Sequence, residues 1–174
     1  MRDILINRGQ ALFNQPRQFI HFANHQEADA LLNDIAQNPH AFLLACIMDR
    51  QIPAERAWLI PYEFRRRLGS FEFSFLSQLS LSDIESTMLN PAPLHRFNKE
   101  MSSHFFSAIR QVVNNYSSNT SNIWSKTPSS ATIVKRFLQF EGVGIKIATM
   151  ATNSLVRDFK IPVSDILIFL QMST

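Results

Sequence analysis

The chain has 174 residues, and its 17 Lys and Arg against 14 Asp and Glu give a formal net charge of +3. Hydrophobic residues make up 45% and charged residues 18%, which excludes a disordered chain and fits one domain, or one domain with a fragment of a second. Fifteen phenylalanines against four glycines favour helices around an aromatic core. The modest positive charge permits binding to a polyanion without requiring it.

The single cysteine, Cys46, excludes an internal disulfide and a metal cluster held by several thiolates. It lies in the apolar run 41–48, so we expect a buried thiol and not a reactive one. That run is the longest apolar one and is too short to span a bilayer. Residues 1–13 lack the apolar block of a signal peptide, and we therefore expect a cytoplasmic protein that does not bind membranes.

The N-terminal half predicts helices separated by proline and glycine. Apolar spacing predicts an amphipathic helix over residues 27–37. Asn38, as a cap, and Pro39, at the first helical position, then start a helix over residues 40–49. This second helix is apolar nearly all round and should lie buried at the centre of the fold.

A third predicted helix opens at Pro53, is kinked by Pro61 and ends at Gly69. Its last turn carries three arginines, residues 65–67. Cations complement the helix dipole there, so a solvated helix end is the preferred interpretation and a DNA contact is the alternative.

The C-terminal half continues in the same pattern. Ser82 and Glu85 predict a capping box for a short helix that ends at Leu89. Residues 97–116 carry one apolar helical stripe, which predicts a helix packed on the core. No segment alternates as a β-strand does, so the predicted fold class is all-α.

A polar loop separates that helix from the last part of the chain. Residues 116–130 are rich in Ser, Asn and Thr, with a helical turn expected around Trp124. Ser129 or Ser130 caps the following helix, which is predicted to reach Phe140.

Gly142 and Gly144 then flank Val143 between two apolar helical runs. Glycine tolerates the positive φ that a tight turn between helices needs. The N–H groups of this turn, and the positive end of the next helix, can approach a phosphate oxygen closely. Lys146 follows in the first turn of that helix. We interpret it as an amine beside a phosphate site, with an ordinary surface lysine as the alternative.

Residues 138–150 resemble the helix-hairpin-helix of the DNA glycosylase superfamily that includes endonuclease III, in which an apolar-x-Gly-Val-Gly-x-Lys-x-Ala pattern recurs. The resemblance covers residues 39–160, with the hairpin at 131–158. It implies a helical bundle or barrel that acts as a monomer on double-stranded DNA. In the bifunctional glycosylase/lyase members, the lysine at the position of Lys146 is the attacking amine. Many other proteins use such a hairpin to hold nucleic-acid backbone without chemistry.

Residues 39–58 look like the glycosylase segment in which a buried helix ends in a glutamine. Gln51 matches that glutamine, which implies that it fills the gap left by a rotated-out nucleotide. Arg50, next to it, is a candidate contact to the DNA backbone. An ordinary surface glutamine and exposed ion pairs are the alternatives.

The family mechanism also implies an aspartate that activates the amine or stabilises positive charge on the sugar. Asp165 follows Lys146 at about the expected separation. Its surroundings, Val-Ser-Asp-Ile-Leu, lack the family's Val-Asp-x-His-Val pattern and the arginine after it. Asp165 is therefore a candidate, and a surface carboxylate is the alternative.

The chain looks closest to a branch of these glycosylases that carries an iron–sulfur cluster loop. A [4Fe–4S] cluster needs four cysteines. None follows Cys46, so we expect no cofactor in this chain and a largely missing second domain. Residues 1–37 would then face the missing half and expose four apolar side chains to water: Phe13, Phe19, Phe22 and Leu31.

A shifted reading frame offers one explanation of residues 161–174. Permitted codon choices, read from the last base of the Asp165 codon, give Tyr-Ser-Asp-Ile-Ser-Ala-Asp-Val-His-Val. This frame ends in the family signature and places its aspartate near Met172, although free third bases make the match permissive. Resequencing the gene tests the idea, because an in-frame tail with no lost base removes it.

The sequence thus predicts a base-excision-repair DNA glycosylase or glycosylase/AP lyase that acts on a flipped damaged base in duplex DNA. A truncated, inactive product is one alternative. A helix-hairpin-helix module that holds DNA backbone without chemistry is another, and a helical protein–protein adaptor is a third. The sequence does not distinguish these, and it does not identify the lesion.

Overall fold

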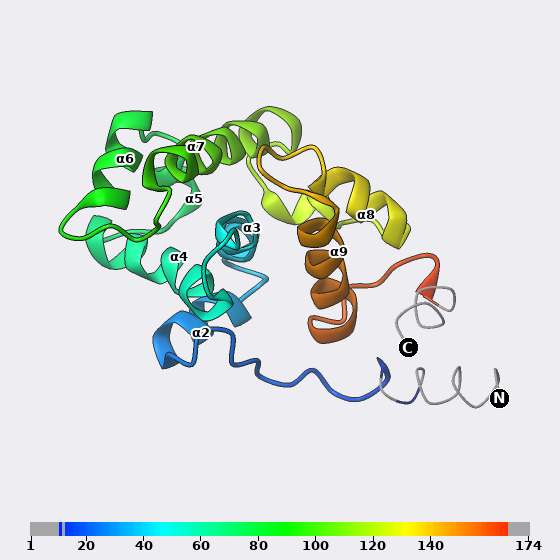
Figure 1. The fold of residues 1–174 in the computed structure, drawn as a ribbon. Coiled ribbons are helices and arrows are strands. Elements are labelled where there is room, and N and C mark those ends of the chain that lie inside the picture. The colour runs from blue at the N-terminus through cyan, green and yellow to red at the C-terminus, as the bar shows by residue number, and fades with distance from the viewer. Residues whose placement is uncertain (1–10, 12, 167–174) are drawn as a thin grey trace.

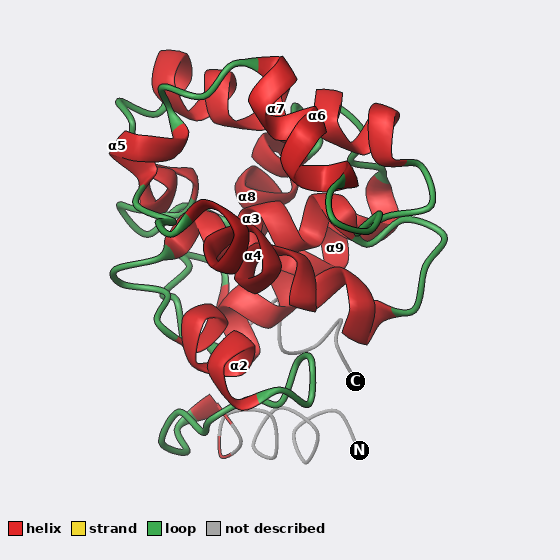
Figure 2. Ribbon diagram, turned by 90° about the vertical axis from the view of Figure 1, so that its left-hand side faces the viewer, coloured by secondary structure: helices red, strands yellow, loops and turns green. Residues whose placement is uncertain are grey.

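The computed structural model describes residue 11 and residues 13–166, and every regular element in that part is helical (Figures 1 and 2). The predicted all-α class is therefore confirmed for these residues. Met172, which carries the shifted-frame hypothesis, lies outside them. The elements, in chain order, are α2 (Gln26–Asn33), α3 (Pro39–Met48), α4 (Ala54–Leu68), α5 (Phe73–Leu76), α6 (Leu81–Leu89), α7 (Asn98–Asn115), the 3₁₀-helix η1 (Thr120–Ile123), α8 (Ser130–Phe137), α9 (Ile145–Asn153) and the π-helical turn η2 (Ser154–Asp158).

Helix α3 is the centre of the molecule, and all of its residues are buried. It lies between α4 and α9 in Figure 1 and also contacts α2, α7 and η1. A helix that is apolar on every side must be surrounded by protein, so the predicted central helix is confirmed. Pro39 is its first residue as expected, but Asn38 makes no capping hydrogen bond. The Asn38 amide instead donates to Asp34 Oδ2 at 3.1 Å.

Two helix boundaries differ from prediction because short polar side chains bond to nearby backbone. Helix α2 ends at Asn33, whose amide nitrogen donates to the carbonyl oxygens of Ile20 and Asp29. The capping box of α6 is formed by Ser80 and Asp83, and not by the residues two positions later. That helix therefore begins at Leu81.

Helix α4 contains Pro61 and ends as predicted at Gly69, which has φ 76° and donates its N–H to the carbonyl of Arg65. Arg65 is exposed and Arg66 pairs with Glu63 at 2.7 Å. The third arginine of the triplet has a structural role. The Arg67 side chain is largely buried, and its guanidinium donates to the carbonyl of Thr87, in the last turn of α6, and to those of Asn90 and Ala92, which follow that helix.

The segment that precedes α2 packs on both halves of the described chain. The Phe22 ring lies 4.8 Å from Trp58 and 5.9 Å from Phe159, measured between centroids. The expected exposure holds for Phe19, which is 53% exposed. It fails for three side chains that are partly or fully buried: Phe13, Phe22 and Leu31.

No helix in the described part of the chain is long and apolar enough to cross a bilayer.

Candidate nucleic-acid interface

The turn between α8 and α9 is anchored to the core by its apolar side chains. Ser129 caps α8 as predicted, and α8 ends at Phe137, three residues earlier than expected. Beyond that end, Phe140 is buried and its ring stacks on Tyr116 with a 6.0 Å centroid separation. Val143 is also buried and donates its N–H to the Phe140 carbonyl at 3.1 Å. With these two side chains turned inward, the glycine backbone forms the outer part of the turn.

Gly142 has φ 81°, in the left-handed region that favours glycine. A Cβ at this position would lie 2.4 Å from Nδ1 of His104, on α7. The His104 side chain is buried, and among the described residues its Nδ1 finds no hydrogen-bond partner. Gly144 has φ −94°, and a Cβ there would meet nothing within 4 Å. The predicted requirement for glycine therefore applies at Gly142, because both its positive φ and the nearby His104 ring exclude a side chain there.

Helix α9 begins at Ile145 directly after the turn, and its N-cap residue, Gly144, has no side chain with which to cap it. The first N–H groups of a helix have no intrahelical acceptor, so these are available to an acceptor from outside the chain. Leu138 and Ile145, at the two ends of the turn, are 42% and 65% exposed. The turn thus presents open backbone donors between two exposed apolar side chains.

Lys146, in the first turn of α9, is exposed, and α9 packs on α3, whose C-cap is Asp49. Burial raises the pKa of the half-buried Asp49 carboxyl, and the positive charge of Lys146 partly opposes that rise. No local spacing could have shown the pair, because packing of α3 on α9 brings the two residues together.

Gln51 is exposed and has φ 54°, a left-handed conformation that side chains rarely adopt. The N–H of Arg50 donates to the Met48 carbonyl at 2.8 Å and tightens this turn. His95 packs behind it, fully buried, and its Nδ1 accepts the N–H of Phe97 at 3.0 Å. The Nε2 therefore carries the proton. Burial lowers the pKa of His95, while the nearby carbonyls of the turn partly oppose this effect.

Two other predicted site residues are engaged with the protein itself. Arg50 Nη1 lies 2.9 Å from Glu100 Oε1, and both side chains are partly exposed. Asp165 accepts two hydrogen bonds from Ser130 at the start of α8, from the N–H and the hydroxyl, both at 2.7 Å. Both oxygens of Asp165 are thus occupied by Ser130, and its role beside Lys146 stays a prediction.

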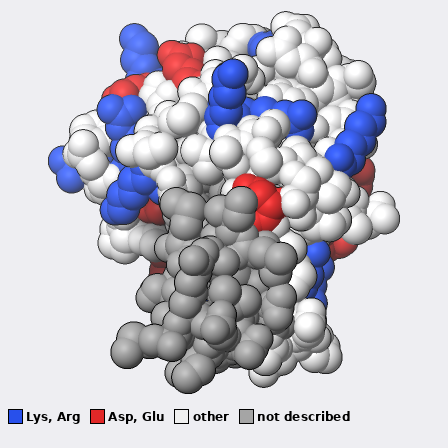
Figure 3. Space-filling model, turned by 90° about the vertical axis from the view of Figure 1, so that its right-hand side faces the viewer, with Lys and Arg blue, Asp and Glu red and all other residues white. Residues whose placement is uncertain are grey.

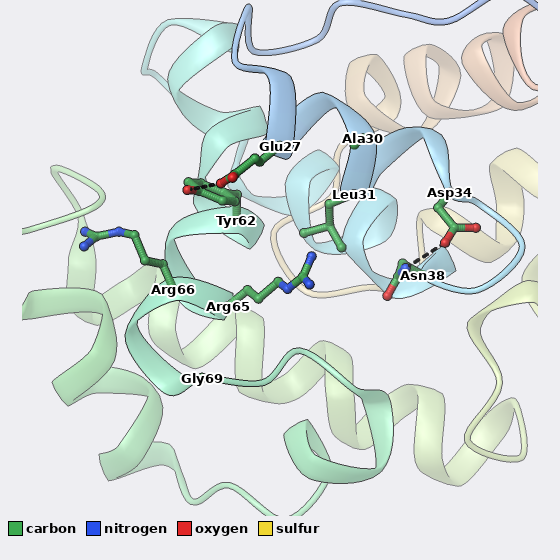
Figure 4. Close-up of a pocket in the computed structure, with 9 residues that line it drawn as sticks. All are labelled: Glu27, Ala30, Leu31, Asp34, Asn38, Tyr62, Arg65, Arg66 and Gly69. Carbon is green, nitrogen blue, oxygen red and sulfur yellow. Dashed lines mark hydrogen bonds between the residues drawn. The ribbon is translucent and has the colours of Figure 1, made fainter.

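A hollow of about 630 Å³ between α2 and α4 lies apart from these residues (Figure 4). Acidic and basic side chains both line it, Glu27 and Asp34 against Arg65 and Arg66. The hydroxyl of Tyr62 donates to Glu27 at 2.5 Å, and this bond raises the pKa of the tyrosine. Because the charges are mixed, the hollow has no preference for an anion.

The residues of this chain do not fit an iron–sulfur cluster. The sequence has one cysteine, and Cys46 is fully buried in α3 as predicted. Among residue 11 and residues 13–166, no three His, Cys, Asp or Glu side chains gather in a way that could hold a metal ion.

Comparison of the chain with models of protein families, with characterised proteins and with solved structures gave no match.

Proposed function

We propose that the protein is a DNA N-glycosylase of the helix-hairpin-helix type that acts on a flipped damaged base in duplex DNA. The observation that carries the proposal is the packing of α9 on α3, by which the charge of Lys146 acts on the Asp49 carboxyl at the start of a helix whose N-cap is a glycine. Gly142, Val143 and Gly144 would hold a phosphate through backbone N–H groups. Gln51, which follows Asp49 by two residues, would fill the gap that the extruded nucleotide leaves.

In this proposal Asp49 accepts a proton from the Lys146 ammonium, and the neutral amine attacks C1′ of the extruded nucleotide. The bond between C1′ and the base nitrogen breaks, and the departing base takes the proton that Asp49 accepted. The attached nitrogen still carries two protons: one passes to O4′ as the sugar ring opens, and the resulting iminium loses the other to solvent, which leaves an imine between Lys146 and C1′. The raised pKa of Asp49 supports its role, because a more basic carboxylate is a better proton acceptor. β-Elimination from this imine would make the protein an AP lyase as well.

Borohydride trapping on duplex DNA with one abasic site tests the proposal. Borohydride delivers hydride to the imine carbon and leaves a stable amine that joins protein to DNA. We expect an adduct with the wild type, none with Lys146→Ala, and an undiminished yield with Lys99→Ala, which changes an exposed lysine on α7. Asp49→Asn should form the adduct about 100-fold more slowly while binding DNA normally, the lower end of the range for general acid–base catalysis. An adduct that persists in Lys146→Ala would refute the assignment.

The second candidate is a helix-hairpin-helix module that holds DNA backbone without chemistry. Two observations favour it: Lys146 is exposed to solvent, and both oxygens of Asp165 are used by Ser130. Salt-sensitive DNA binding, with no adduct and no base release, would decide for this module.

A further inference from the structure

A second polar groove, of about 920 Å³, lies where the C-terminal end of α7, the loop around η1 and helix α8 meet. Three cations line it, Lys126, Lys135 and Arg136, and no carboxylate does. Its polar lining also includes the side-chain amides of Asn115, Asn122 and Gln139 and the hydroxyls of Ser117, Ser125 and Thr132. Figure 3 views the molecule from the side on which α8 lies in Figure 1, and basic side chains are spread over the upper half of that face.

The cations of the groove are not neutralised by the protein. Lys126 and Lys135 are exposed, and none of the three cations forms an ion pair in the part of the chain that the structure describes. Arg136 is held in place, since its Nη1 donates to the Ile123 carbonyl at 2.7 Å. Its remaining N–H groups are donors for another acceptor. The groove is thus an unpaired positive surface with one fixed guanidinium.

The lining chemistry selects phosphate over nucleobases. Guanidinium, ammonium and amide groups are suitable donors for phosphate oxygens. A base would need an open aromatic face on which to stack. Tyr116, the aromatic residue of the lining, is 9% exposed, and its ring is already stacked on Phe140.

The groove and the glycine turn are close along the chain. Gln139 lines the groove and precedes Gly142 by three residues, which limits their Cα separation to about 11 Å. One DNA strand places a phosphate every ~3.4 Å along the helix axis, so that separation corresponds to about three phosphates. A strand whose backbone is held at the turn can therefore reach the groove within a few nucleotides.

We infer that this groove binds the phosphodiester backbone of the strand held by the glycine turn, at phosphates a few nucleotides away from the extruded one. The inference rests on the proposed function, because it takes DNA as the ligand. It assigns Lys126 and Lys135 to sequence-independent backbone contacts that extend the interface beyond the hairpin.

The test measures duplex DNA binding by fluorescence anisotropy over a range of salt concentrations. The double variant Lys126→Gln/Lys135→Gln removes two cations from the groove. Each phosphate contact contributes about 0.9 to the slope of log K against log salt, so this slope should become shallower by about 2. The control, Arg65→Gln/Arg66→Gln, removes the same charge from the end of α4, where acidic side chains are close by. Its slope should match the wild type.

The outcomes separate this inference from the proposed function. Equal slopes for the groove variant and the wild type would overturn the groove assignment and leave the glycosylase proposal standing. A shallower slope in a protein that forms no borohydride adduct would support the groove and remove the enzyme. Displacement of DNA by inorganic tripolyphosphate at equal phosphate concentration would assign the groove to free polyphosphate and overturn the inference. Absence of DNA binding at low salt would overturn both proposals.

Discussion

Gly142→Ala should destabilise the protein through two separate effects that the other glycines can isolate. A non-glycine residue at φ 81° costs about 1 kcal/mol, because its Cβ crowds the backbone. The new methyl group would also lie 2.4 Å from His104 Nδ1, which is closer than contact distance. Displacing a buried side chain by overpacking costs about 1–3 kcal/mol. We therefore expect a loss of about 2–4 kcal/mol in the free energy of unfolding.

Two control variants separate these effects. Gly69 has φ 76°, and a Cβ there meets nothing within 4 Å, so Gly69→Ala reports the conformational cost alone, about 1 kcal/mol. Gly144 has negative φ and equally open space, so Gly144→Ala avoids both effects and should lose only the preference of an N-cap for glycine over alanine, about 0.5–1 kcal/mol. In a His104→Ala background the overlap is gone, and Gly142→Ala should cost no more than Gly69→Ala.

Urea unfolding at neutral pH, followed by circular dichroism, gives these free energies for all the variants. Equal losses for Gly142→Ala and Gly69→Ala would refute the packing of His104 against the turn. A cost at Gly142 that is unchanged by His104→Ala would refute it independently.

Three further predictions concern buried polar groups. Burial raises the pKa of Asp49 in the folded state, so ionisation of this carboxyl destabilises the fold as pH rises through its folded-state pKa. The melting temperature of Asp49→Asn should therefore exceed that of the wild type at pH 7. An equal excess at pH 3, where the carboxyl is protonated, would contradict this. The pKa of His95 is lowered, so its neutral form supports folding above the ordinary value of 6.5, and stability falls as pH drops below it. His95→Asn, which keeps an acceptor for the neighbouring N–H, should lose less stability than the wild type between pH 7 and pH 5 in denaturant titrations. Arg67→Lys removes most of the three hydrogen bonds to carbonyls and should lower the free energy of unfolding by about 2–3 kcal/mol in urea titrations. A loss below about 0.5 kcal/mol would show that these bonds do not stabilise the end of α6 and the turn that follows it.

The parts of the fold that were predictable are those with a local physical cause. Helix α3 is apolar on every side and could only be buried, and the left-handed end at Gly69 needs no tertiary contact. Where two local hydrogen bonds compete for the same helix end, the cap predicted from the sequence was wrong. Asn38 bonds to Asp34 in place of the α3 backbone, and the capping box of α6 lies two residues earlier than predicted.

The candidate site was only partly predictable, because its important contacts are not local. The glycine pair and Lys146 can be read from the sequence. The neighbours of these residues cannot, since Asp49 and His104 reach the turn from α3 and α7. The charged groove could not be predicted for the same reason, because tertiary packing brings together its cations from a loop and from α8. Roles given to Gln51 and Asp165 by the resemblance stay predictions, and the observed bonds of Asp165 are to Ser130.

The stacking of Phe22 against Phe159 has a consequence for biosynthesis. Roughly 140 residues separate the two rings, and a ribosome needs roughly 7–28 s to add that many at 5–20 residues per second. For that interval the nascent segment before α2 has no partner on the C-terminal side, and its aromatic side chains are open to chaperones or to a second nascent chain. A ribosome-bound fragment that stops before residue 159 should therefore recruit a chaperone more strongly than one that extends past it.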